Sequence, residues 1–222
     1  MLIIFDCDGV LVDSEQLAAQ VFSSALAEIG VSMPADECFS TFHGKTLNAC
    51  YSWLQENKKI SLPVTFANML ERNTQSRFAA ELRSVEGIEQ VLDYLVQKQI
   101  PFCVASNGGH KKIRHSLKTT GLLSYFEHLF SAQDVALGKP HPDLFLYAAR
   151  KMNTLASNVL VIEDSISGVR AAISAGMEVL LYGSVSEEAK WQGLGKVVEN
   201  FSQMSELVEL IDNKFNELKV EA

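Results

Sequence analysis

The chain has 222 residues, of which 47 % are hydrophobic and 21 % are charged, and its formal net charge is −8. This length is enough to bury a sizeable core, and the composition is that of a folded protein and not of a disordered chain. The acidic balance argues against nucleic acid and anionic membranes as partners, and no apolar run is long enough to span a bilayer.

The chain opens with the apolar run Leu2-Ile3-Ile4-Phe5, followed at once by acidic residues. A signal peptide would need a basic start and a longer apolar stretch, so we expect a cytoplasmic protein. The cysteines have neither CxxC nor paired spacing, which predicts reduced, mostly buried thiols. We expect a monomer or a small homo-oligomer. The four cysteines are Cys7, Cys38, Cys50 and Cys103.

Short apolar runs alternate with helical patterns along most of the chain. Continuous apolar strands of this kind are typical of a parallel sheet that is covered on both faces. Apolar stripes at helical spacing lie between them, including one from Ser165 to Ala175 that Gly176 would end. The alternation predicts an α/β fold with an open, doubly wound, Rossmann-like parallel sheet. The five strand candidates are residues 2–7, 101–105, 128–130, 159–162 and 178–182.

A long helical region separates the first two strand candidates, where a single crossover helix would suffice. One apolar stripe in it runs from Leu17 to Ile29 and stops at Gly30, and a second runs from Leu47 to Leu54. We therefore expect an inserted α-helical module over residues 15–83. Residues 1–14 and 84–222 would form the Rossmann-like core.

The run Asp6-Cys7-Asp8-Gly9 follows the first strand directly. Residues i and i+2 on extended backbone point the same way, so both carboxylates could reach one site. Two close carboxylates repel unless a cation lies between them, and oxygen ligands favour Mg²⁺. Gly9 would let backbone approach a ligand. The alternative is a loop with two solvated aspartates.

Three further polar motifs stand at or near the ends of later strands. Ser106 and Asn107 could hold a phosphate oxygen or could simply form a turn or cap. Lys139 is followed by Pro140 and Pro142, which would fix the backbone around it and aim its ammonium group. It could neutralise phosphate charge, or it could be an ordinary surface lysine. Glu163 and Asp164 are placed for a metal, or Asp164 caps the next helix. All of these residues would line one edge of a parallel sheet, and such a joint arrangement is unlikely to arise by chance.

In this order, the motifs DxDG, Ser-Asn, Lys-Pro and Glu-Asp closely resemble those of the haloacid dehalogenase superfamily of phosphohydrolases. The match covers nearly the whole chain, and residues 5–15 and 161–165 are its most specific parts. The helical insertion resembles the small cap of the superfamily's first cap class. The runs Phe42-His43-Gly44-Lys45, Ser106-Asn107-Gly108 and His115-Ser116-Leu117 look most like bacterial phosphatases of 6-phosphogluconate.

The resemblance implies a role for each motif residue. Asp6 would be the nucleophile that forms an aspartyl phosphate, and Asp8 would be the general acid and base. Ser106 and Lys139 would hold phosphoryl oxygens. Mg²⁺ would bind the Asp6 carboxylate, the Asp8 backbone carbonyl and Asp164, with Glu163 in or near its shell. The residues expected to bind substrate are Asp6, Asp8, Gly9, Ser106, Asn107, Lys139, His43 and Lys45.

The expected activity is Mg²⁺-dependent hydrolysis of a small phosphorylated metabolite, such as the sugar-acid phosphate 6-phosphogluconate. His43 and Lys45 would select the substrate, unless they only form a charged turn. A phosphosugar mutase of the β-phosphoglucomutase type shares every core motif but has a histidine where Ala18 stands. A dehalogenase or phosphonatase would lack Asp8. A catalytically silent binding or regulatory relative would be expected to have lost a motif residue, and none is missing.

Overall fold

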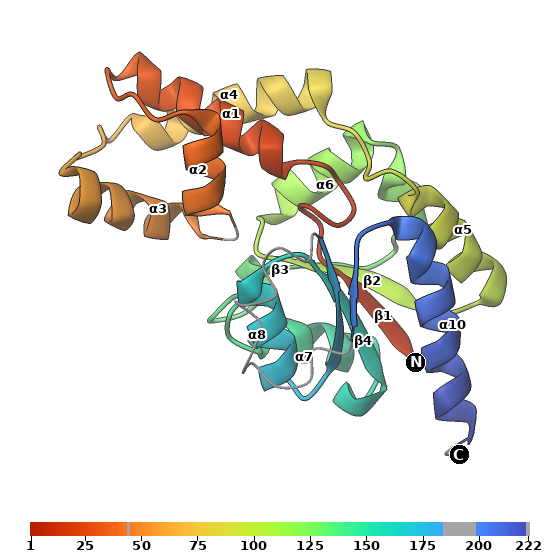
Figure 1. Ribbon diagram of the computed structural model, residues 1–222. Helices are drawn as coiled ribbons and strands as arrows, with labels where there is room; N and C mark the ends of the chain where they lie inside the picture. Colours follow the sequence, from red (N-terminus) through yellow and green to blue (C-terminus); the bar gives the residue numbers. More distant parts are fainter. Residues whose placement is uncertain (44, 184–198, 221–222) are drawn as a thin grey trace. The chain divides into compact units, whose positions relative to one another are not determined.

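Six parallel strands form one sheet in the order β3-β2-β1-β4-β5-β6 (Figure 1). The computed structural model describes residues 1–43, 45–183 and 199–220. The predicted doubly wound parallel sheet is confirmed, whereas β6 was not predicted because its sequence, Glu-Asn-Phe, contains no apolar run. The strands are β1 (Leu2–Phe5), β2 (Phe102–Ser106), β3 (Leu129–Ser131), β4 (Val159–Glu163), β5 (Glu178–Tyr182) and β6 (Glu199–Phe201).

The two central strands, β1 and β4, are buried along their whole length. Ile4 of β1 pairs with Cys103 of β2 on one side and with Val161 of β4 on the other. Since side chains alternate between the two faces of a strand, a strand inside a doubly covered sheet needs apolar residues on both. This explains why β1 and β4 read as continuous apolar runs.

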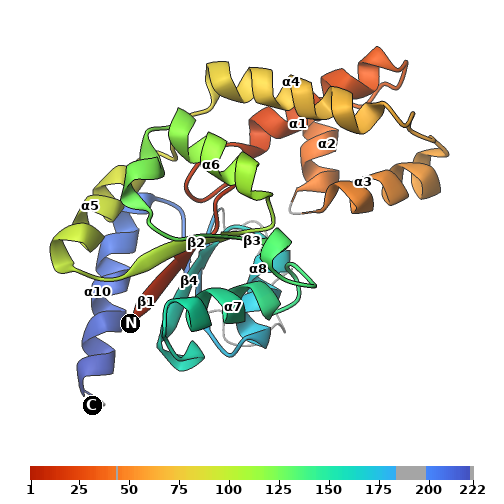
Figure 2. The same cartoon turned by 180° about the vertical axis from the view of Figure 1, so that it is seen from behind.

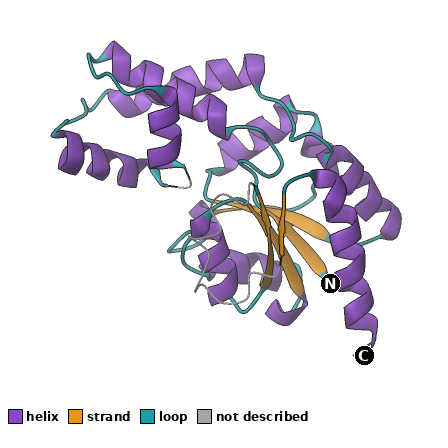
Figure 3. Ribbon diagram, viewed as in Figure 1, coloured by secondary structure: helices purple, strands orange, loops and turns teal. Residues whose placement is uncertain are grey.

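Helices cover both faces of the sheet, as Figures 2 and 3 show. On one face, α7 (Asp143–Lys151) and α8 (Ile166–Ser174) pack in a core cluster with Leu2 and Ile4. The opposite face carries α5 (Ile88–Lys98), α6 (His110–Thr119) and α10 (Met204–Val220), and α5 contacts α10.

Local sequence explains where the helices on the first face begin and end. In α7, Asp143 stands in the first turn and Arg150 and Lys151 in the last, which matches the helix dipole. Helix α8 is capped by Ser165, whose Oγ accepts a hydrogen bond from the N–H of Gly168 at 3.1 Å. The alternative in which Asp164 caps this helix is therefore wrong.

A second compact unit comprises residues 13–83, and the remaining residues form the first. Its described residues contain helices and loops but no strand (Figure 3). Phe22 lies at its centre, with its ring centroid 5.1 Å from that of Phe42 and 5.8 Å from that of Phe66. Its helices are α1 (Glu15–Glu28), α2 (Ala35–Phe42), α3 (Leu47–Trp53), the π-helical turn η1 (Leu54–Lys58) and α4 (Phe66–Glu81).

Strand order reverses between β1 and β4, because the chain fills the sheet outward from β1 on one side and from β4 on the other. In open α/β sheets, ligands bind outside the carboxyl ends of the strands at this switch point.

Short 3₁₀ turns connect the remaining elements: η2 (Leu122–Tyr125), η3 (Ala132–Asp134) and η4 (Ala156–Asn158). Within the described part of the chain, no helix is both long and apolar enough to cross a membrane.

Candidate active site

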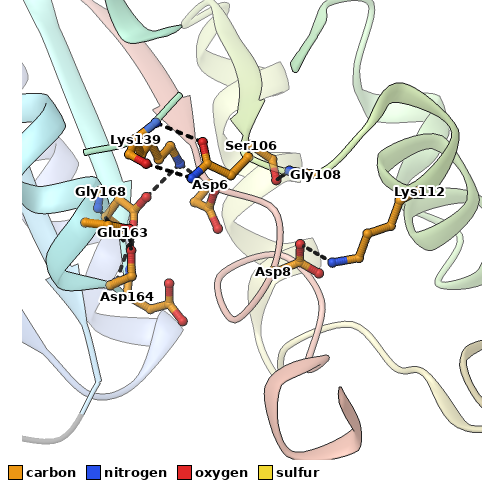
Figure 4. Close-up of polar contacts among 12 residues, drawn as sticks. Asp6, Asp8, Ser106, Gly108, Lys112, Lys139, Glu163, Asp164 and Gly168 are labelled. Carbon is orange, nitrogen blue, oxygen red and sulfur yellow. Dashed lines mark hydrogen bonds and ion pairs between the residues drawn. The ribbon is translucent and has the colours of Figure 1, made fainter. Parts of the chain in front are cut away.

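A buried cluster of charged side chains lies at the switch point of the sheet (Figure 4). Asp6 follows β1, Glu163 ends β4, and Lys139 comes from the segment between η3 and α7. The Lys139 ammonium lies 2.5 Å from Asp6 Oδ1 and 2.7 Å from Glu163 Oε1. The lysine side chain is only 2 % exposed. Sequence reasoning identified all three residues, and the structure brings them into direct contact.

The Glu163 carboxylate is held on both oxygens. While Oε1 accepts from Lys139, Oε2 accepts hydrogen bonds from Asp164 N at 3.0 Å, from Ser165 N at 2.9 Å and from Ser165 Oγ at 2.9 Å. The first turn of α8 is built against this group, because a Cβ at Gly168 would lie 1.7 Å from Glu163 Oε1. Glu163 is therefore fixed from several directions at once.

Burial and charge set the protonation of this cluster. Burial raises the pKa of Asp6 well above its ordinary value; the ammonium of Lys139 opposes the rise, whereas Glu163, Asp164 and Asp8 add to it. Burial alone would lower the pKa of Lys139, but Asp6 and Glu163 raise it above its usual value. Lys139 thus stays charged, and its Nζ also lies 4.7 Å from the centroid of the Phe145 ring, a favourable cation–π position.

The acidic residues of this cluster fit a divalent cation. Asp6, Glu163 and Asp164 each offer an oxygen, and these atoms lie within 4.8 Å of one another. A single lysine cannot balance so many carboxylates, and all-oxygen ligand sets suit Mg²⁺. The Asp8 carboxylate, a sequence candidate for the metal, is not part of this group.

The carboxylate of Asp8 has a different partner from that of Asp6. Its Oδ2 lies 2.7 Å from Nζ of Lys112, which stands in the first turns of α6 (Figure 4). The chain leaves the extended strand at Phe5, and Gly9 has a φ of +81°, so strand alternation does not govern Asp8. Sequence reasoning missed Lys112. The only feature that could have indicated it is its position in the chain, a few residues after Ser106 at the end of a predicted strand.

The end of β2 is tied to neighbouring segments. Ser106 Oγ accepts a hydrogen bond from Gly108 N at 3.0 Å, and Ser131 Oγ of β3 donates to Gly108 O at 2.6 Å. The side-chain amide of Asn107, predicted to bind substrate, is bonded to the backbone of Lys139. Ser106 is buried beside these contacts.

The sequence candidates for substrate selection lie in the second unit. His43 Nε2 is 3.5 Å from Glu15 Oε2, and its ring stacks on Phe39 with centroids 5.0 Å apart. Lys45 is exposed, and its backbone N–H donates to Phe42 O at 3.0 Å. Gly44, between them in the predicted loop, lies outside the described residues. The roles of His43 and Lys45 therefore stay predictions.

Comparison with known proteins gives this geometry a context. Residues 3–182 match the family described as haloacid dehalogenase-like hydrolase. The chain is 32 % identical to 6-phosphogluconate phosphatase of Escherichia coli, over 94 % of this chain and 93 % of the relative. It is 28 % identical to a phosphorylated carbohydrates phosphatase of Thermotoga maritima, over 82 % and 84 %. A crystal structure of a hydrolase of this family from Deinococcus radiodurans, with bound phosphate and sodium, superposes with a TM-score of 0.78 at 30 % identity, covering 93 % and 92 %.

We predict that Gly168→Ala lowers the free energy of unfolding by about 1–3 kcal/mol, the usual cost of overpacking a buried site. The new methyl group must displace the Glu163 carboxylate from its hydrogen bonds. Urea denaturation measures the effect, with Ser174→Ala at an exposed position of the same helix as the control. Equal stability of the two variants would contradict this description of the α8 terminus.

Proposed function

Because the chain belongs to the haloacid dehalogenase-like hydrolase family, we propose that this phosphatase hydrolyses a small phosphorylated metabolite through a phosphoryl group carried on Asp6. The observation that carries the proposal is the buried contact between Asp6 and Lys139 at the switch point of the sheet. The same ammonium also contacts Glu163. A carboxylate in such a place is desolvated and held by one cation, at the strand ends where ligands of open α/β sheets bind.

In the first step, a carboxylate oxygen of Asp6 attacks phosphorus as the bond to the substrate's ester oxygen breaks. The electron pair leaves with that oxygen, which takes its proton from Asp8. In the second step, water attacks phosphorus, Asp8 accepts a proton from it, and the bond to Asp6 breaks. General acid and base help of this kind contributes roughly 10²–10⁴ in rate.

Lys139 and Ser106 would hold the phosphoryl oxygens during both steps. Lys139 suits this role because neighbouring carboxylates keep it protonated and because its burial strengthens its charge interactions. Lys112 would hold the Asp8 carboxylate apart from the Asp6 carboxylate, which separates the acid–base group from the nucleophile.

The carboxylates of Asp6, Asp164 and Glu163 would hold Mg²⁺, together with the backbone carbonyl of Asp8. When bound, the ion would offset the charge of the phosphoryl group and of the carboxylates. The residues of the chain would still provide nucleophile, proton transfer and orientation.

For the substrate we propose sugar or sugar-acid phosphates, with 6-phosphogluconate as the first choice. The names of the two curated relatives support this class. The residues 13–83, which we propose act as the cap, would supply selectivity through His43 and Lys45. A mutase activity has less support, because α1 carries Ala18 where mutases of the β-phosphoglucomutase type have a histidine.

The direct test of the mechanism is Asp6→Asn. The amide is nearly isosteric with the carboxylate but is a very poor nucleophile, so we expect turnover to fall below about a thousandth of wild type with the fold intact. Phosphate release from a panel of phosphorylated metabolites measures it, with exposed Asp36→Asn as the matched control. Activity near wild type, with deamidation excluded by mass spectrometry, would contradict the proposal.

We expect metal-free protein in excess EDTA to show no turnover and added Mg²⁺ to restore it. The physical reason is the repulsion among Asp6, Glu163 and Asp164, which a single lysine leaves unbalanced. Phosphate release before and after addition of Mg²⁺ is the measurement. Undiminished turnover without metal would remove Mg²⁺ from the mechanism.

Lys45→Ala tests substrate selection separately. A lysine that pairs with the substrate carboxylate should be worth about ten- to a hundredfold in kcat/KM for 6-phosphogluconate. The loss should be much smaller for a small aryl phosphate, which lacks that carboxylate. Exposed Lys59→Ala is the control. Equal losses on both substrates, or none, would make Lys45 an ordinary surface charge.

A further inference from the structure

The side-chain amide of Asn107 binds both backbone polar groups of Lys139. Its Nδ2 donates to Lys139 O at 3.0 Å, and its Oδ1 accepts from Lys139 N at 2.9 Å. The two residues come from different segments: Asn107 directly follows β2, and Lys139 lies between η3 and α7. The amide therefore ties the backbone of the lysine to the central part of the sheet.

The segment that carries Asn107 is itself well fixed. The preceding residue, Ser106, ends β2 and pairs with Ser131 of β3. The following residue, Gly108, donates to Ser106 Oγ and accepts from Ser131 Oγ. Asn107 thus links the backbone of Lys139 to two adjacent strands, β2 and β3.

Lys139 needs such a constraint. Its ammonium must stay between Asp6 Oδ1 at 2.5 Å and Glu163 Oε1 at 2.7 Å, although a lysine side chain has four flexible carbons. A shift of the backbone at its root would disturb the geometry of both contacts. A displacement of about 1 Å at a reacting centre can cost on the order of 10²-fold in rate.

The packing at Gly138 supports the same conclusion. A Cβ on this glycine would lie 2.6 Å from Asn107 Oδ1 and 3.0 Å from the Cβ of Ala132. The amide of Asn107 thus fills the space that any side chain at position 138 would need. The close approach of the two segments depends on a glycine there.

We propose that Asn107 is a positioning residue that holds the backbone of Lys139, so that the ammonium stays seated between Asp6 and Glu163. Its effect on a phosphate ester passes through Lys139, instead of through a contact of its own amide with the substrate as sequence reasoning expected. The consequence for turnover rests on the phosphatase function proposed above, whereas the seating of Lys139 is a property of the protein alone.

The test is the reactivity of Lys139 toward reductive dimethylation, read by mass spectrometry. In wild type, the buried ammonium should be protected while exposed lysines react. In Asn107→Ala, labelling of Lys139 should rise at least about tenfold. Asn158→Ala, at an exposed position of the same unit, should leave it unchanged. The buried thiol of Cys103 on β2 reports general unfolding, because it reacts with a thiol reagent only if the core opens.

Two further variants separate this role from simple space filling. Asn107→Asp keeps the shape but replaces the donor to Lys139 O with an acceptor, so Lys139 should become as reactive as in Asn107→Ala. Gly138→Ala should have a similar effect because it displaces the amide. Adding Gly138→Ala to Asn107→Ala should increase labelling little further, since the atom that causes the closest clash is already gone.

In parallel, kcat/KM for phosphate release should fall about 10²-fold in the variants that expose Lys139. Loss of turnover with Lys139 still protected would overturn the inference and favour a direct substrate contact. Unchanged labelling in Asn107→Asp would overturn it in favour of packing. If wild-type protein releases no phosphate from any ester, the proposed function fails, and the labelling result still decides the role of Asn107.

Discussion

The charge balance around Lys139 is the constraint on which the rest of the site depends. One ammonium, 2 % exposed, lies within hydrogen-bonding distance of Asp6 and Glu163. An unpaired buried charge costs several kcal/mol, so the ammonium and the two carboxylates stabilise one another in this buried place. Burial raises the pKa of Asp6, Lys139 only partly opposes this rise, and the neighbouring carboxylates add to it. The negative charge that one lysine leaves unbalanced explains why the cluster fits a divalent cation.

The parallel sheet is what brings these groups together. Carboxyl ends of parallel strands meet at one edge, so residues that follow β1, β2 and β4 become neighbours although they are far apart in the chain. The helices contribute locally as well. The two residues before α8, Asp164 and Ser165, donate their backbone N–H groups to Glu163 Oε2, and α6 provides Lys112 opposite Asp8.

Two aspartates of one short motif therefore have different surroundings. Asp6 is buried against a lysine that is itself buried, whereas Asp8 pairs with Lys112, whose side chain is 45 % exposed. A nucleophile and an acid–base group need such a difference, because one must stay fixed while the other exchanges a proton with substrate and water. The strand ends at Phe5, before both aspartates, and Lys112 of α6 then pairs with Asp8.

Local pattern was enough to predict the strands that carry Asp6, Ser106 and Glu163, because buried parallel strands must be apolar and the polar residues mark their ends. It also gave the helices that follow, whose stripes and stop signals are short-range. β6 could not be predicted, since two of its three residues are polar and its pairing with β5 depends on the rest of the sheet. The partners of the charged and polar site residues could not be predicted from the sequence either. The pairs Lys112 with Asp8 and Asn107 with Lys139 are set by how distant segments pack in three dimensions, and only the tertiary structure decides that.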